Sequence, residues 1–209
     1  MLFAPLWKTL LYASGLALLP APLDETEDAL ALGNEHSWLP ARGGSGGSPQ
    51  SLKCPATQVA VGVYGRVATS VNSLGLLCRT LNAEGSLGAS SATAMAGSTQ
   101  GRAFSIQCPD GQAVVGFRGH SGELLEALGL HCAAPDAWMH SAQVQGSVDP
   151  VGSHSGDAFS DVCSQESVIT ELYVRTGHNV DRQQATCTRM RSTPAASDRG
   201  LKKIGRAHV

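Results

Sequence analysis

Three segments of the chain alternate apolar residues with small or polar ones. The alternating positions are Val59, Val61 and Val63 in the first segment, Ala113, Val115 and Phe117 in the second, and Val168, Thr170, Leu172 and Val174 in the third. A period of two is typical of a strand with one buried face. The pattern therefore predicts three strands whose alternate side chains enter a core.

Six cysteines show that these segments belong to one repeat. Each segment follows one cysteine and precedes another, and the paired positions are Cys54 with Cys78, Cys108 with Cys132, and Cys163 with Cys187. The interval within each pair is the same, which favours three disulfides of equal geometry over the other connectivities. Each bond would stabilise the fold by about 3 kcal/mol through restriction of the unfolded chain. Short Cys-x-x-Cys or His clusters are absent, so no metal site and no cofactor are predicted.

A glycine-rich segment precedes the first cysteine of every copy at the same spacing. Gly97 and Gly101 in the second copy correspond to Gly152 and Gly156 in the third. Counting back from Cys54 in the same way reaches residues 43–48, which we interpret as the first glycine loop. Composition alone would indicate a flexible linker there, and this alternative stays open.

The repeats predict an all-β domain over residues 43–192. A second strand of each copy is expected to end at the second cysteine, and the glycine-rich segment must then bring the chain back across the sheet. One small antiparallel sheet cannot bury its inner face alone. Three of them can close around a shared core, and few aromatic residues (5%) with 24 glycines fit short strands and tight turns.

The N-terminal segment is nearly free of polar residues over Leu10–Leu19, after a single basic residue at Lys8. This is typical of a secretory signal, which we expect at residues 1–21. A membrane anchor is the alternative, because Leu2–Leu23 is long enough to span a bilayer, but three prolines within it disfavour a spanning helix. An even number of cysteines after such a segment favours an oxidising compartment. We therefore expect a secreted, extracellular protein with no stable membrane insertion of the mature chain.

Two further segments lie outside the repeats. Residues 22–42 are expected to form a linker or a short helix, because acidic residues precede the Ala-Leu-Ala-Leu-Gly sequence that ends at Gly33. Residues 193–209 are expected to be a disordered tail. Within this tail, residues 204–209 resemble the translation of a sequencing-library adapter and are expected to carry no function.

Charge and motifs exclude several classes of function. The formal net charge of -2 gives no field that would attract nucleic acid. The seven histidines are scattered, and no nucleophile elbow or phosphate-binding loop is present, so we expect no catalytic residues and no enzyme. Several acidic residues of the third copy are expected to be ordinary surface charges; these are Asp157, Asp161, Glu166 and Glu171.

The segment Val115–Leu130 resembles a hallmark of jacalin-like lectin domains. It reads as a strand, then Gly-His-Ser-Gly, then acidic residues and an Ala-Leu-Gly sequence. The three cysteine-containing repeats are also similar to the vitelline membrane outer layer protein 1 family of secreted proteins. The resemblance covers about 150 residues and implies a β-prism I fold of three Greek-key repeats with pseudo-threefold symmetry and one disulfide per repeat.

The resemblance also implies a sugar site between a glycine loop and a Gly-x-x-x-Asp loop. Backbone amides of glycines would donate to sugar hydroxyls, and the carboxylate would accept two charge-assisted hydrogen bonds. The implied primary site consists of Gly177, His178, Asn179, Val180 and Asp181 with Gly43, Gly44, Gly46 and Gly47. The implied secondary site, with a longer carboxylate, consists of Gly122, Glu126, Gly152 and Gly156. The first copy has Ala68 and Asn72 at these positions, and so lacks both the glycine and the charge.

The sequence thus favours a secreted, non-catalytic protein that binds glycans or glycoproteins. A structural extracellular or coat protein of the vitelline type is the second interpretation, since the glycines and Asp181 can also serve only to form turns. An enzyme that acts on glycans is the third. Loss of glycan binding on changing Asp181, self-assembly without sugar binding, or oligosaccharide turnover would separate the three.

Overall fold

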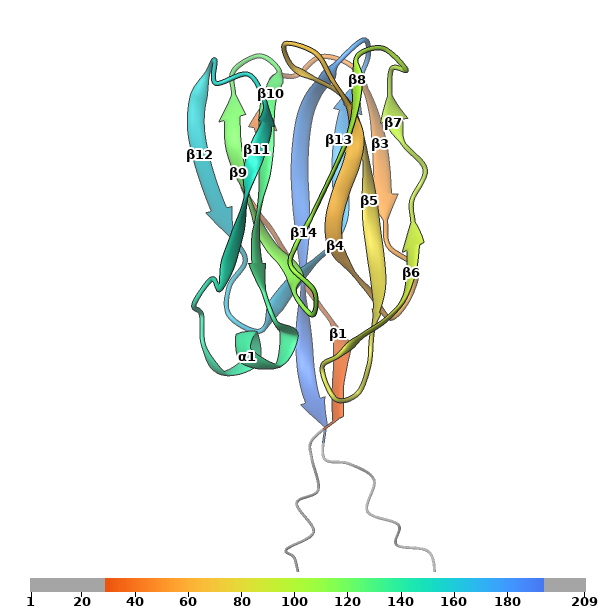
Figure 1. Cartoon of the computed structure of the whole chain (residues 1–209), viewed down its shortest axis with the longest axis vertical. Helices are drawn as coiled ribbons and strands as arrows, with labels where there is room; N and C mark the ends of the chain where they lie inside the picture. The colour runs from red at the N-terminus through yellow and green to blue at the C-terminus, as the bar shows by residue number, and fades with distance from the viewer. Residues whose placement is uncertain (1–28, 194–209) are drawn as a thin grey trace, which may run out of the picture.

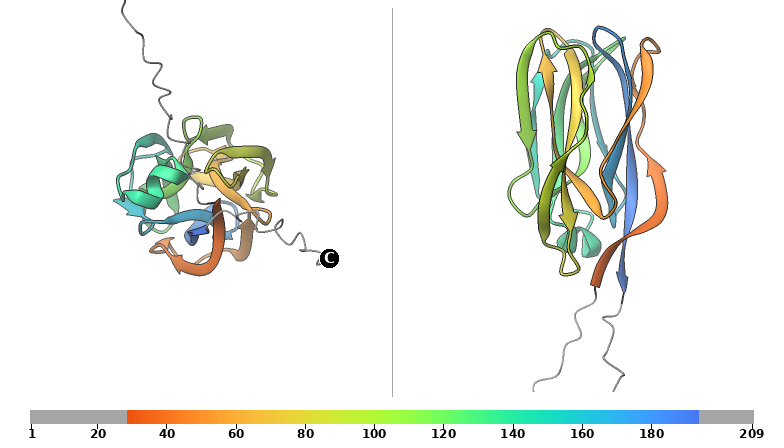
Figure 2. Two further views of the ribbon diagram at one scale, coloured as in Figure 1. Left: turned by 90° about the horizontal axis from the view of Figure 1, so that it is seen from below. Right: turned by 90° about the vertical axis from the view of Figure 1, so that its right-hand side faces the viewer.

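The computed structural model describes residues 29–193, which form a three-sided prism of antiparallel sheets (Figures 1 and 2). The view along the prism shows the three sheets around one central axis (Figure 2). This confirms the predicted β-prism with three repeats. Residues 1–21 and 194–209 lie outside the described residues, so the expected signal and almost all of the expected tail have no structural counterpart here.

The strands are distributed over the three sheets as follows. Sheet A contains β1 (Ala29–Trp38), β2 (Arg42–Gly43), β3 (Ser48–Lys53), β13 (Ser167–Thr176) and β14 (Val180–Thr193). Sheet B contains β4 (Gln58–Val67), β5 (Val71–Leu81), β6 (Leu87–Ala92), β7 (Ala96–Gly97) and β8 (Arg102–Gln107). Sheet C contains β9 (Ala113–Ser121), β10 (Leu125–Ala133), β11 (Gly146–Gly152) and β12 (Asp157–Val162).

Each sheet combines a hairpin with the glycine-rich segment that follows it. β8 pairs with β4, and β12 pairs with β9, although the sequence repeat assigned these segments to the next copy. The last hairpin, β13–β14, has no following segment of this kind. β3 from the start of the domain pairs with β13 instead, so sheet A contains both ends of the described chain.

The expectation of a linker or short helix over residues 22–42 is wrong for its described part. Residues 29–38 form β1, which pairs with β14 from Ala29 opposite Thr193 to Trp38 opposite Thr186. The physical reason is burial, because Leu30 is buried and Leu32 packs against the same cluster. The domain therefore begins well before residue 43, and its last strand ends at Thr193.

The simple alternation predicted for the first strand of each hairpin is interrupted. Val59 and Val61 pack in one hydrophobic cluster, whereas Val63 packs in the central one. The cause is a β-bulge, which inserts one residue and shifts the inward face. The bulge occurs at the same repeat position in every sheet, at Val61, Val115 and Thr170.

The bulge residues also connect neighbouring segments. Their carbonyl oxygens accept hydrogen bonds from the first cysteine of a disulfide, at 2.8 to 3.0 Å. The pairs are Cys108 with Val61, Cys163 with Val115, and Cys54 with Thr170. The bulge therefore both bends the strand and places the cysteine.

The three disulfides have the predicted pairing, with a sequence separation of 24 in each. Each bond joins two different sheets rather than two strands of one sheet. Cys54 follows β3 of sheet A and bonds to Cys78 in β5 of sheet B. The second bond joins sheets B and C, and the third joins sheets C and A. The disulfides thus link the three sheets in a closed ring, and their cysteines lie in or against the central core.

A second, smaller core closes the end of the prism where β1 begins and β14 ends (Figure 1). A short helix, α1 (Pro135–His140), covers this end and buries Trp138. The indole Nε1 of Trp138 donates to the Ser167 carbonyl at 2.9 Å, which satisfies its polar group inside the core.

Candidate carbohydrate-binding site

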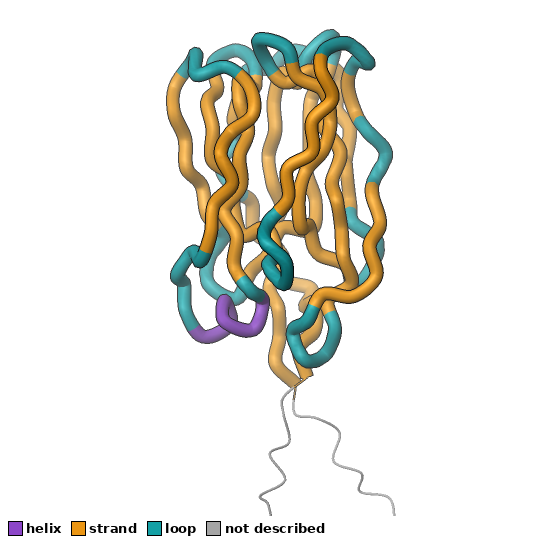
Figure 3. Tube along the Cα trace, viewed as in Figure 1, coloured by secondary structure: helices purple, strands orange, loops and turns teal. Residues whose placement is uncertain are grey.

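Two kinds of loop meet at the prism end opposite the start of β1 and the end of β14 (Figures 1 and 3). One kind is the glycine loop before β3, β8 and β12. The other is the turn of the main hairpin of each sheet. The topology places residues 43–47 beside 177–181, residues 97–101 beside 68–72, and residues 152–156 beside 122–126.

The primary site has the arrangement that the sequence implied. The amide of Gly44 donates to the Asp181 carbonyl at 2.8 Å. A Cβ atom placed on Gly46 would lie 2.4 Å from Asp181 Oδ1, and one on Gly47 would lie 2.6 Å from Oδ2. Only glycine therefore lets the loop approach the carboxylate this closely. The Oδ2 atom is buried and has no hydrogen-bond partner among the described residues.

Two arginines that sequence reasoning missed hold the glycine loop by its carbonyl oxygens. Arg175 Nε donates to Gly46 at 2.8 Å, and its Nη2 donates to Gly47 at 2.7 Å. Arg182 Nε donates to the carbonyl of Gly44 at 2.6 Å. With its carbonyls held in this way, the loop turns its glycine Cα atoms toward Asp181.

The start of the glycine loop is fixed by an ion pair with sheet C. Arg42 donates to both carboxylate oxygens of Asp161, at 2.6 and 2.7 Å, and lies over the ring of Phe159. Asp161 is 9% exposed, so its interpretation as an ordinary surface charge is wrong. The bidentate partner stabilises the charged guanidinium and raises the pKa of Arg42.

Residues of the implied primary loop differ in how they face the site. His178 is exposed, whereas the side chain of Val180 is fully buried in the central core. Any contact of Val180 with a ligand must therefore involve its backbone. Asn179 Oδ1 accepts a hydrogen bond of 3.0 Å from Asn72, which fastens this loop to the hairpin turn of sheet B.

The same backbone frame occurs at all three loop pairs. Each glycine loop donates one amide to the carbonyl of the residue at the Asp181 position, at 2.8 to 3.1 Å. The donor and acceptor pairs are Gly44 with Asp181, Ser98 with Asn72, and Ser153 with Glu126. The three sites therefore differ mainly in side chains on a common frame.

The secondary site brings Gly122, Glu126, Gly152 and Gly156 together as implied. A Cβ atom on Gly152 would lie 2.1 Å from the Glu126 carbonyl, and one on Gly156 would lie 2.7 Å from Ser121 backbone atoms. The three atoms nearest to the Gly156 position include no Glu126 side-chain atom. The longer carboxylate thus does not reproduce the contact that Asp181 makes with its loop.

Comparison with known proteins supports the same fold. Residues 33–131 match the family model of the jacalin-like lectin domain. The structure of wild-type Malaysian banana lectin matches with a TM-score of 0.55 and 19% identity, over 74% of this chain and 99% of the lectin. This chain has a jacalin-like lectin fold. A mannose-binding jacalin-related lectin from Ananas comosus (TM-score 0.55, 19% identity, 74% and 98% coverage) is similar, as is a mannose-binding lectin from Champedak (0.56, 15%, 75% and 99%).

No curated protein matches this chain in sequence. Within residues 29–193, no helix is both long and apolar enough to cross a membrane. The same part of the chain contains no group of three or more His, Cys, Asp or Glu residues that could hold a metal ion.

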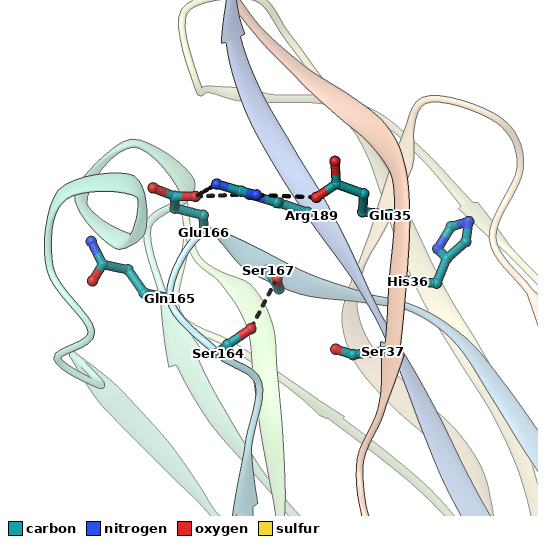
Figure 4. A pocket seen from close by; sticks show the side chains of 8 residues that line it. All are labelled: Glu35, His36, Ser37, Ser164, Gln165, Glu166, Ser167 and Arg189. Carbon is teal, nitrogen blue, oxygen red and sulfur yellow. Dashed lines mark hydrogen bonds and ion pairs between the residues drawn. The ribbon is translucent and has the colours of Figure 1, made fainter.

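A groove elsewhere on the prism carries two carboxylates, Glu35 and Glu166, on either side of Arg189 (Figure 4). Arg189 contacts Glu35 at 3.0 Å and Glu166 at 2.7 Å, and Arg191 also contacts Glu35 at 2.9 Å. The hydrogen bond and charge of Arg189 lower the pKa of Glu35. A glycosidase acid needs a raised pKa, so the environment of Glu35 is opposite to the one that glycoside hydrolysis requires.

His131, in β10 of sheet C, is expected to make the stability of the fold depend on pH. Burial, followed by the charge of Arg118, lowers the pKa of His131 from 6.5. The unfolded state then takes up a proton first as the pH falls below 6.5, so folding stability is lost on acidification. Leu77 occupies the equivalent position of sheet B. We expect His131→Leu to show a smaller loss of unfolding free energy than the unchanged protein between about pH 7.5 and pH 5.

Chemical denaturation at the two pH values measures this difference. Other titrating groups are common to both proteins and cancel in the comparison. Equal losses in the two proteins would contradict the assigned role of His131.

Proposed function

We propose that this protein is a secreted lectin without catalytic activity, and that its primary sugar site lies between Asp181 and the glycine loop of residues 43–47. The observation that carries the proposal is the half-buried Asp181 carboxylate, which packs against Gly46 and Gly47 and has no protein donor among the described residues. Because Oδ2 is closed off by the loop, a sugar hydroxyl would donate to Oδ1, and the charge of the carboxylate makes such a hydrogen bond strong. The backbone beside it is glycine, so the loop packs directly against the carboxylate and adds no side chain around it.

Several observations support the choice of a neutral hexose. Two of the similar structures are described as mannose-binding lectins. The Asp181 loop combines a carboxylate acceptor with glycine-loop backbone, which suits adjacent hydroxyl groups on one ring. Three disulfides and the apolar N-terminal segment support the proposed extracellular location.

A structural extracellular role is the second candidate, and the ring of disulfides favours it. The three bonds fasten every sheet to its neighbours, which suits a durable coat protein. The altered residues at two of the three equivalent sites, Glu126 and Asn72, also fit a prism that uses its surface for packing rather than for recognition.

Exchange of Asp181 for Asn tests the lectin proposal with little change in shape. We expect the affinity for methyl α-mannoside and for mannose-terminated glycans to fall about 100-fold, because two charge-assisted hydrogen bonds become weaker neutral ones. Isothermal titration and a glycan array on the oxidised protein measure the loss. Asp110→Asn, at an exposed carboxylate outside the three loop pairs, is the matched control and should leave this binding unchanged.

The outcome separates the two candidates. Binding that is undiminished in Asp181→Asn rules out the primary site. Self-assembly of the unchanged protein, with no glycan bound on the array, would favour the structural role instead.

A further inference from the structure

Two exposed aromatic side chains share the outer face of sheet A. Trp38 on β1 is 67% exposed, and Tyr173 on β13 is 41% exposed. Trp38 lies opposite Thr186, and Tyr173 lies opposite Gln184. Directly opposed residues of an antiparallel pair point to the same face, and so do alternate residues of one strand. Both aromatic side chains therefore project from one surface.

The composition of the central core confirms that this surface is the outer face of sheet A. Ala185 and Cys187, the neighbours of Gln184 and Thr186 along β14, belong to the central hydrophobic cluster. The alternate residues Gln184 and Thr186 consequently face outward. β14 separates β1 from β13, so strand spacing and rise place the Cα atoms of the two aromatic residues about 12 Å apart.

Polar groups lie around and between the two aromatic side chains. Gln184 donates its amide to the Leu39 carbonyl at 3.2 Å, which draws its side chain toward β1. Glu171, opposite Thr186 on the other side, accepts a hydrogen bond from Ser51. The surface thus alternates aromatic faces with fixed amide, hydroxyl and carboxylate groups.

The equivalent faces of the other two sheets lack this arrangement. In sheet B, Tyr64 lies opposite Gly75, and a Cβ atom on Gly75 would be 2.4 Å from the tyrosine ring. The Tyr64 ring therefore lies flat on the sheet, and its hydroxyl donates to the Thr93 carbonyl at 2.6 Å. In sheet A, Gln184 replaces that glycine. Its side chain occupies the space over the sheet, so the Tyr173 ring cannot pack flat on the backbone as the Tyr64 ring does.

In sheet C, an arginine takes the place of the tyrosine. Arg118 lies opposite Gly129 and reaches Ser147 at 3.4 Å. Only sheet A therefore presents an upright tyrosine at this position, and sheet A is also the sheet that keeps Gly177 and Asp181.

The aromatic face is continuous with the primary site. Tyr173 is three residues from the end of β13, where the turn that leads to Asp181 begins. Arg175 and Arg182, which hold the glycine loop, lie opposite each other on the same outer face between Tyr173 and that turn. A ligand that leaves the primary site along sheet A would therefore meet Tyr173 and then Trp38.

A protein partner fits this face less well than a sugar chain. The other large exposed hydrophobic residues do not belong to sheet A: Met95 lies between β6 and β7, and Val162 ends β12 of sheet C. Two aromatic side chains separated by polar groups fall short of the roughly 800 Å² per partner that a stable interface buries. A hexose ring instead combines an apolar C–H face, which stacks on an aromatic ring, with hydroxyls that need polar partners.

We propose that Tyr173 and Trp38 form an extended subsite that stacks successive hexose units of an oligosaccharide whose terminal sugar occupies the Asp181 site. The location of the terminal sugar rests on the proposed function. The aromatic face rests on its own geometry and defines the ligand class as a linear oligosaccharide rather than a single sugar.

Titration of the oxidised full chain with methyl α-mannoside and with linear mannotetraose tests this subsite. We expect mannotetraose to bind at least tenfold more tightly than the monosaccharide. Trp38→Ala and Tyr173→Ala should each remove about tenfold of the tetrasaccharide affinity and leave monosaccharide affinity unchanged. Tyr173→Phe keeps the ring and should retain most of the gain, whereas Tyr64→Phe, at the equivalent position of sheet B, should change neither affinity.

The outcomes separate this inference from the proposed function. Equal affinity for the two ligands in the unchanged protein overturns the extended subsite and leaves the Asp181 site standing. Tetrasaccharide binding that depends on Trp38, without monosaccharide binding, supports the aromatic face and overturns the Asp181 site. Binding of neither ligand overturns both, and sedimentation that shows a dimer lost in Trp38→Ala overturns the subsite in favour of a second copy.

Discussion

Joint exchange of Cys163 and Cys187 for Ala is expected to lower the free energy of unfolding by about 3 kcal/mol. The bond closes a loop with a sequence separation of 24, and its loss returns that loop's freedom to the unfolded chain. A loss of this size corresponds to about 6 to 12 °C in Tm for a domain of this length. Denaturant unfolding of the oxidised proteins measures the difference.

The repeat provides its own controls for this experiment. Joint exchange of Cys54 and Cys78 should cost a similar amount, because the loop has the same separation and the Cα–Cα distance is again 5.8 Å. Reduction of the unchanged protein removes the bonds without removing side-chain volume, and so separates loop closure from cavity formation. A variant as stable as the unchanged protein would show that its bond adds nothing to the fold.

Exchange of Gly47 for Ala is expected to abolish binding at the primary site and to lower the free energy of unfolding by about 3 kcal/mol. The added Cβ atom would lie 2.6 Å from Asp181 Oδ2 and 2.7 Å from backbone atoms of Thr176. These atoms cannot all move away without separating the glycine loop from β13. Sugar titration and denaturant unfolding together report both effects.

Gly111→Ala is a matched control for the backbone conformation. Gly111 has a φ of +77°, close to the +68° of Gly47, but no atom lies within 4 Å of its Cβ position. Thr57 and Glu166 occupy the equivalent turn of the other copies with φ of 65° and 67°, so a side chain fits there. We expect Gly111→Ala to cost about 1 kcal/mol and to retain binding. Equal effects of the two exchanges would show that φ alone, and not the contact with Asp181, determines the loss.

The repeat and the disulfides were predictable because they depend on spacing, which the sequence records directly. β1 was missed because acidic residues followed by an Ala-Leu run also fit the start of a helix. A signal was nevertheless present, since Leu32 and Gly33 lie 55 positions before Leu87 and Gly88. Leu87 pairs with Leu81 in sheet B as Leu32 pairs with Met190 in sheet A.

The bulges and the arginines show where sequence reasoning reaches its limit. A bulge depends on how the strand bends to close the prism, so the alternation through Val61 gave no sign of it. The pairing of the glycine loop with Asp181 came from family resemblance, whereas the carbonyl contacts of Arg175 did not. Arg66, which lies at the equivalent position and bonds the carbonyl of Gly101, is the repeated feature that would have indicated this role.

Sheet A combines the first and last strands of the described chain, so it can be completed only at the end of translation of the domain. β1 and β3 leave the ribosome first, but their partners β13 and β14 leave last, and a chain grows by roughly 5 to 20 residues per second. The glycine loop is therefore synthesised early, whereas Asp181 is added only when the translation of this domain is almost complete. A chain that stops before the last hairpin lacks Asp181 and the proposed primary site, so sugar binding, if the proposed function holds, would distinguish finished molecules from interrupted ones.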